Sequence, residues 1–167
     1  MGLYYAWHGI TRFDRGVATV NLFLNRSSRW MDIDSYLPYE GKVVLRNKRA
    51  HTALVRIPDW VDRNSLEFMR NDEKEDYRMA GNYLHIGGLL PEEVLTVNFQ
   101  VEECTDQYTI ADKKYTITYH GSTVTDISPR QAGAKIYPYY TKKGIESKSA
   151  PLKKAMRFAA TKVLSLQ

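Results

Sequence analysis

Short runs in which apolar and polar residues alternate recur along most of this chain. The run at residues 94–101 is the clearest, because every second position is apolar: Leu95, Val97, Phe99 and Val101. Successive side chains of a strand point to opposite faces, so this alternation predicts a half-buried strand. Further strands are predicted near residues 17–25, 30–33, 42–46, 51–57, 83–86, 115–119 and 123–127. Strands at a spacing of roughly 8–12 residues favour an all-β sandwich or barrel.

A convincing helical pattern occurs at the C-terminal end. Ser149 suits an N-cap and Pro151 suits the first turn of a helix. The residues at positions i, i+4, i+7 and i+11 are apolar: Leu152, Met156, Ala159 and Val163. The sequence therefore predicts an all-β protein, an antiparallel β-sandwich with one C-terminal α-helix.

A length of 167 residues fits one domain. Residues 1–10 are short and aromatic, and they are interpreted as the end of a helix or an extended lead-in. Residues 11–130 hold the predicted strands and form the β-sandwich domain. Residues 131–167 form a basic tail that contains the predicted C-terminal helix.

The positive charge of the chain is concentrated in this tail. Residues 130–167 contain nine Lys or Arg and one acid, a net charge of +8, whereas residues 1–129 carry −3. A basic tail suits nucleic acid or an acidic surface. No nucleic-acid-binding motif accompanies it, so we interpret the tail as a solvated helix face with a charged loop and expect no nucleic-acid partner.

Several protein classes are excluded by simple counts. No stretch approaches the roughly 20 apolar residues of a membrane span, so no membrane partner is expected. The N-terminus lacks a basic stretch followed by an apolar core, so we expect no secretory signal here and a cytoplasmic location if the chain is expressed as it stands. A single cysteine, Cys104, excludes an internal disulfide and a cysteine-based zinc cluster.

The sequence offers no catalytic constellation. The four histidines are scattered without metal-ligand spacing: His8, His51, His85 and His120. Asp32 and Asp34 share one face of a predicted strand, where two surface carboxylates are commonplace. Cys104 is interpreted as a structural or surface cysteine. We therefore predict no catalytic residue, no metal ligand and no cofactor in this chain.

Aromatic residues near predicted turns supply the candidates for carbohydrate contact: Trp7, Trp30, Tyr36 and Tyr39. The C–H face of a sugar packs well on an aromatic ring. The alternative is that these rings are ordinary core and interface residues, which we favour for Trp60. Pro38 and Gly41 also predict that residues 36–43 form a structural hairpin.

Five motifs, in this order, carry a resemblance to a known family. They are VNLFLNR at residues 20–26, DIDSYLPYEGKV at 32–43, VRIPDW at 55–60, GNYL at 81–84 and DISPR at 126–130. Together they resemble the region after the catalytic barrel in bacterial glycoside hydrolase family 127, the β-L-arabinofuranosidase-like proteins. The resemblance covers the chain from about residue 3 onward.

The resemblance implies an (α/α)6 barrel that performs hydrolysis, followed by β-sandwich domains. It places the zinc-bound cysteine nucleophile, the other zinc ligands and the acid/base glutamate in the barrel. None of those motifs occurs in this chain, and Cys104 lacks the adjacent cysteine. The zinc is thus expected in the barrel and not here, and residues 1–10 would be the last stub of that barrel.

Two functional hypotheses follow. In the first, the chain is a non-catalytic accessory β-sandwich that supports the barrel of a glycoside hydrolase. In the second, it is a stand-alone carbohydrate-binding module. The expected partners are the (α/α)6 barrel of the same parent protein, a saccharide, and a second copy of the chain that meets it through residues 1–10. An independent enzyme would need a catalytic constellation, so the chain alone is predicted to be inactive.

Overall fold

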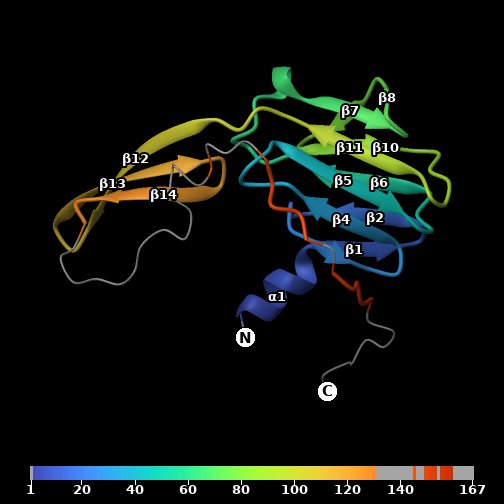
Figure 1. Ribbon diagram of the computed structural model, residues 1–167, viewed down its shortest axis with the longest axis horizontal. Coiled ribbons are helices and arrows are strands. Elements are labelled where there is room, and N and C mark those ends of the chain that lie inside the picture. The colour runs from blue at the N-terminus through green and yellow to red at the C-terminus, as the bar shows by residue number, and fades with distance from the viewer. Residues whose placement is uncertain (1, 131–144, 146–148, 154, 160–167) are drawn as a thin grey trace.

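The computed structural model describes residues 2–130, 145, 149–153 and 155–159, and these are mostly strands (Figure 1). The first sheet has the order β1-β2-β6-β10-β9. Its strands are β1 (Thr11–Asp14), β2 (Val17–Val20), β6 (Thr52–Arg56), β10 (Tyr83–Ile86) and β9 (Arg78–Ala80). A short helix, α1 (Gly2–Gly9), precedes β1, and a 3-10 turn, η1 (Arg63–Ser65), precedes the strand β7.

The second sheet has the order β3-β4-β5-β11-β7-β8. Its strands are β3 (Arg26–Ser27), β4 (Met31–Ser35), β5 (Lys42–Asn47), β11 (Val94–Asn98), β7 (Glu67–Arg70) and β8 (Glu73–Lys74). Among the described strands, β2 and β6 pair in parallel and the other neighbours pair antiparallel. The predicted all-β, mainly antiparallel fold is confirmed.

The core lies between these two sheets and follows the predicted alternation. In β11 the side chains of Leu95 and Val97 are fully buried, and in β6 those of Ala53 and Val55 are as well. The large side chains with almost no exposure come from both sheets: Val20, Met31, Ile33, Val43, Leu45, Val55, Phe68, Leu84, Leu95 and Val97. At roughly 1.5–3 kcal/mol for each fully buried large apolar side chain, this layer supplies most of the driving force for folding.

A third sheet lies to one side of the sandwich (Figure 1). It contains β12 (Glu103–Ile110), β13 (Lys113–His120) and β14 (Thr123–Ser128). Every residue of β12 is exposed. Sequence analysis missed β12, whose sequence is ECTDQYTI, because Asp106 interrupts the alternation of Cys104, Tyr108 and Ile110 with polar residues.

The predicted strand at residues 17–25 is too long. Strand β2 ends at Val20, and the backbone amides of Asn21 and Leu22 both donate to the carbonyl of Ile10. The chain therefore leaves the sheet there, and Leu22 and Leu24 become 36% and 52% exposed. Alternation continued past the strand, but the hydrogen-bond ladder did not.

Within the described residues, the structure contradicts the predicted C-terminal helix. Residues 149–153 and 155–159 have no helical structure, and Val163 lies outside the described residues. Instead, the amide of Ala150 donates to Glu40 Oε1 at 2.8 Å, and the side chain of Arg157 contacts Asp34. These contacts with the sheet replace the intrahelical hydrogen bonds of an isolated short helix, which is marginal in water.

Candidate functional site

Residues 149–153 and 155–159, here called the strap, lie along the outer face of the second sheet near β4. Between the strap and the sheet is a groove with two parts, of about 320 and 1020 Å³. Both parts are lined by Asn25, Asp34, Lys153, Ala155 and Arg157. We call this the edge groove.

An ion pair crosses the edge groove. Nη2 of Arg157 lies 2.8 and 3.0 Å from the two carboxylate oxygens of Asp34, and Nη1 lies 3.7 Å from Asp32. Arg46 approaches Asp34 from the sheet at 3.7 Å. The hydrogen bond from Arg157 to Asp34 raises the pKa of Arg157 above its ordinary value. The strap is thus anchored to β4 by charge.

The side chain of Asp32 is more deeply buried than that of Asp34. Its carboxylate accepts hydrogen bonds of 2.6 Å from Lys48 Nζ and 2.6 Å from Ser27 Oγ, and its side chain is only 10% exposed. Burial alone would raise the pKa of Asp32, but these hydrogen bonds outweigh it and hold the pKa below its usual value. Asp32 and Asp34 thus hold cationic side chains of the chain itself.

Helix α1 contributes Trp7 to the smaller part of the edge groove. The guanidinium of Arg26 lies over the ring of Trp7, 3.5 Å from its centroid, and donates to the Trp7 carbonyl. Burial lowers the pKa of Arg26. Its Nε is buried and has no acceptor among the described residues.

The structure places three of the four predicted aromatic candidates around this groove and one elsewhere. Trp7 lines the smaller part, and Tyr36 and Tyr39 line the larger part. Trp30 is packed against the core, where it stacks on Phe13 at 5.4 Å and donates from Nε1 to Thr11 Oγ1 at 3.1 Å. Trp30 therefore has a structural role.

Cations cover one face of two of the remaining rings. Arg26 covers Trp7, as described above, and Lys42 Nζ lies 4.9 Å from the ring centroid of Tyr36. Tyr36 and Tyr39 belong to the turn between β4 and β5, which pair antiparallel, so the predicted hairpin at residues 36–43 is confirmed. Sugar stacking on Trp7 or Tyr36 would have to use the opposite face of the ring.

A second cavity of about 450 Å³ lies near the exit from β2, and it is lined mainly by apolar side chains. Its lining includes Leu22 and Leu24 from the segment after β2, and Pro58 and Trp60 from the segment after β6. Trp60 also meets Phe99 edge-on at 5.7 Å and packs against the core, in agreement with its predicted structural role. Sequence analysis missed this cavity, which depends on the early end of β2.

The groups with catalytic potential are dispersed. Cys104 is a free, exposed thiol on β12. Within the described residues, no three or more His, Cys, Asp or Glu side chains are grouped so that they could hold a metal ion. None of the described helices is long and apolar enough to cross a membrane. Sequence analysis missed the extended path of the strap, for which its basic residues were only a general signal.

Comparison with known proteins bears on the fold. No protein-family model matches the chain, and no curated protein sequence matches it. Among solved structures, a glycoside hydrolase family 127 β-L-arabinofuranosidase from Geobacillus stearothermophilus is similar, with a TM-score of 0.52 and 19% identity. The similarity covers 70% of this chain and 21% of that enzyme.

Two further structures agree with this result. A second β-arabinofuranosidase of the same family has a TM-score of 0.55 and 15% identity, over 69% of this chain and 23% of that protein. A protein described as a glycoside hydrolase has a TM-score of 0.50 and 15% identity, over 64% and 20% of the two chains. This chain thus has the fold of a β-sandwich region of glycoside hydrolases, and it spans about a fifth of their length.

Proposed function

We propose that this chain is a non-catalytic accessory β-sandwich domain of a glycoside hydrolase related to the β-L-arabinofuranosidases, and that it supports an (α/α)6 catalytic barrel. The similarity to about a fifth of each enzyme supports a partial, domain-sized role. The five sequence motifs in the same order support the same parentage.

The observation that carries the proposal is the state of α1. None of its residues is buried, although it is rich in large apolar side chains. The exposed fractions are 89% for Leu3, 52% for Tyr4, 63% for Tyr5 and 49% for Trp7. A helix that is apolar around its circumference is normally enclosed by other elements. A barrel of helices, preceding or adjoining α1, would enclose it.

The first test is catalytic. The full chain incubated with aryl α- and β-L-arabinofuranosides should release no aglycone above the buffer rate, because glycoside hydrolysis needs a paired-carboxylate set or a comparable nucleophile and acid. Turnover that survives repurification and responds to a point substitution in this chain would contradict the accessory role.

The second test is genetic and physical. The coding region in frame with or beside this chain should encode an (α/α)6 domain, and the two polypeptides should form a complex in analytical ultracentrifugation. If no such domain is encoded there, the proposal fails.

The larger part of the edge groove favours a second candidate, a carbohydrate-binding module, because Tyr36 and Tyr39 line it. Isothermal titration with arabinose-containing oligosaccharides separates the two. The accessory role predicts no saturable heat with the full chain. Binding that is lost in Tyr39→Ala, with thermal stability unchanged, would favour the binding module.

A further inference from the structure

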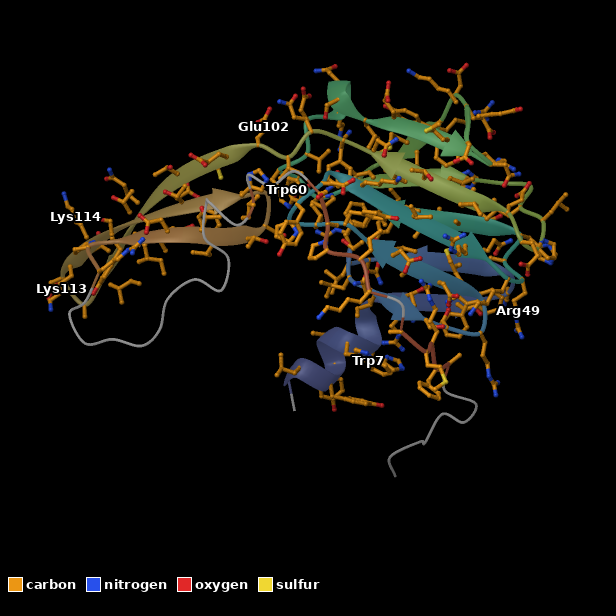
Figure 2. All side chains as sticks on the ribbon, in the orientation of Figure 1. Trp7, Arg49, Trp60, Glu102, Lys113 and Lys114 are labelled. Atoms are coloured by element: carbon orange, nitrogen blue, oxygen red, sulfur yellow. The ribbon has the colours of Figure 1, made fainter. Side chains whose placement is uncertain are left out.

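We propose that the cavity of about 450 Å³ beside Trp60 binds a small, neutral aromatic molecule that carries a hydroxyl group, a phenol in the simplest case. We call it the junction cavity, because it lies where the sandwich meets the third sheet, at the place of Trp60 in Figure 2. Its lining comes from the segments after β2 and β6 and from the turns that follow β4 and β13. This site goes beyond the proposed function and does not depend on a barrel.

Part of the lining belongs to an aromatic cluster that the core holds in place. Phe23 is 7% exposed and stacks on Phe99 at 5.6 Å, and Trp60 meets the same Phe99 ring edge-on. Gly121 packs against Trp60 so closely that a Cβ there would lie 3.0 Å from the indole ring. The Gly121 amide also donates to the carbonyl of Glu102 at 2.9 Å, which fixes the turn between β13 and β14. The junction cavity is therefore preformed, as sites for small ligands usually are.

The junction cavity leaves apolar surface in contact with water. Leu22 and Leu24, on its lining, are 36% and 52% exposed. Its volume lies within the range of about 300–1,000 Å³ that is typical of small-molecule sites. A ligand with an apolar body would remove this surface from water, which is favourable in proportion to the area covered. Six of the lining residues are apolar: Leu22, Phe23, Leu24, Leu37, Pro58 and Trp60.

Two oppositely charged side chains line the junction cavity without pairing with each other. Within the described residues, the side chain of Arg56 has no hydrogen-bond or ion-pair partner, and neither does the hydroxyl of Ser122. Asp59 Oδ1 accepts from Asn82 Nδ2 at 2.8 Å, and Arg63 Nη2 donates to the same amide at 2.7 Å. These contacts orient the Asp59 carboxylate, and its Oδ2 has no partner in the described part of the chain.

This pattern of charge selects the polar group of the ligand. A carboxylate would be repelled by Asp59 and an ammonium by Arg56, whereas a hydroxyl accepts from a guanidinium and donates to a carboxylate. The rings of Phe23 and Trp60 favour an aromatic body, because aromatic rings attract one another in offset and edge-to-face arrangements. A saccharide would place most of its hydroxyls against apolar side chains, where they would lack partners.

The experiment titrates the full chain with 4-ethylphenol and follows two-dimensional proton–nitrogen NMR spectra. The indole N–H of Trp60 and the amide of Gly121 should shift in a saturable way, with a Kd of about 0.1–1 mM for a ligand of so few atoms. Three analogues keep the ethylphenyl body and change its polar group: 4-ethylanisole cannot donate, 4-ethylbenzoate is an anion and 4-ethylbenzylammonium is a cation. These analogues and L-arabinose should each bind at least about fivefold more weakly.

Substitutions locate the apolar contact. Leu22→Ser combined with Leu24→Ser should weaken binding of 4-ethylphenol at least about fivefold, because it removes two apolar side chains from the lining. Leu90→Ser is the matched control, since Leu90 is 64% exposed and lies outside the lining, and it should change the Kd less than about twofold. Ser122→Phe, which adds a ring to the lining, should also weaken binding. Circular dichroism melting shows that each variant is folded.

Substitutions of the charged residues test the polar contact. Arg56→Gln and Asp59→Asn should each weaken binding of 4-ethylphenol about three- to tenfold, because charge-assisted hydrogen bonds are stronger than neutral ones. The control is Arg12→Gln, which changes an exposed arginine of β1 and should leave the Kd within about twofold of wild type.

The outcomes are distinct. The absence of saturable shifts up to about 10 mM 4-ethylphenol overturns the proposal, and so do shifts confined to the edge groove. Equal losses in the Leu22/Leu24 variant and in Leu90→Ser also overturn it. Tighter binding of 4-ethylbenzoate or of L-arabinose than of 4-ethylphenol overturns the assigned class of ligand. None of these results bears on the barrel, so the accessory role is tested separately.

Discussion

At the scale of single residues, Asn47 joins three backbone groups inside the sandwich. Its side chain is 1% exposed, its Nδ2 donates to the carbonyls of Ala50 and Leu90 at 2.9 and 2.7 Å, and its Oδ1 accepts from the Ala50 amide at 2.9 Å. A buried polar group that loses its partner costs about 1–3 kcal/mol. The loop before β11 and the turn after β5 are therefore held together by one amide.

Asn47→Ala should lower the free energy of unfolding by about 3 kcal/mol, because it leaves buried backbone groups unsatisfied. Urea unfolding followed by tryptophan fluorescence measures this. The matched control is Asn98→Ala, whose amide reaches only Met69 Sδ at 3.5 Å, and its loss should stay near 1 kcal/mol. An equal loss in both variants would contradict the role given to Asn47.

Gly41 shows how closely the hairpin approaches β11. A Cβ atom there would lie 1.8 Å from the carbonyl oxygen of Phe99, a backbone atom, while the Phe99 amide donates to the Gly41 carbonyl at 2.8 Å. Gly41→Ala should therefore lower the free energy of unfolding by about 3 kcal/mol or more. Gly87→Ala, whose Cβ would meet only His85 Cε1 at 3.8 Å, is the control, and chemical denaturation should show it within about 1 kcal/mol of wild type.

Asp32 gives the chain a defined response to acid. Its pKa is held below the usual carboxyl value, so its stabilising contribution is present above the ordinary carboxyl pKa of about 3.9 and is lost as the pH falls through its lower folded-state pKa. Wild type should therefore lose stability below about pH 4. Asp32→Asn should be less stable than wild type at neutral pH, but its free energy of unfolding should fall less as the pH drops below about 4. Urea midpoints between neutral and acid pH test this, with the exposed Asp72→Asn as control.

At the scale of elements, the three sheets differ in how far their residues are shielded from water. In β5, Val43 and Leu45 are fully buried, and the strand is paired on both sides, by β4 and β11. In β12 all eight residues are exposed, and β13 is its only neighbour in the described sheet. Local opening of β12 should need much less free energy than opening of β5.

Native-state hydrogen exchange should show this difference directly. Amides of β5 and β11 should exchange only through global unfolding, whereas amides of β12 should exchange at least about a hundredfold faster. Mass spectrometry of peptic peptides resolves the two regions. Equal protection in β12 and β5 would mean that the third sheet is covered in solution.

At the scale of the whole molecule, the exposed apolar surface of α1 is unfavourable to leave in water. Each apolar square ångström that is buried contributes on the order of 25 cal/mol, and large apolar patches on monomers usually find partners. For the chain by itself, the simplest closed arrangement is a two-fold dimer through this surface.

The isolated chain should therefore self-associate at high micromolar concentration. Light scattering on the full chain should show a concentration-dependent dimer, and a version that lacks residues 1–9 should be mainly monomeric. A strictly monomeric full chain would contradict this prediction, and a dimer that persists after the deletion would place the contact elsewhere.

The sequence by itself determined the strands whose apolar side chains face the core. Residues 83–86 form β10 as predicted, and the inward positions Ala53, Val55 and Ile57 near β6 are all buried. Period-two alternation is a local property, because burial of one face selects it wherever a strand lies on a core. The hairpin at residues 36–43 was equally predictable, since its turn chemistry is local.

The tertiary structure alone decided the order of the strands, the early end of β2 and the path of the strap. The helical spacing of Leu152 and Met156 was real, but contacts with distant residues outweighed it: Glu40 captures the amide of Ala150, and Asp34 captures Arg157. Likewise, three candidates for carbohydrate contact met at one groove because β4, α1 and the strap converge there. Such pairings join residues more than 100 positions apart, and the free energy that selects them comes from packing and charge in the folded chain, which no local pattern encodes.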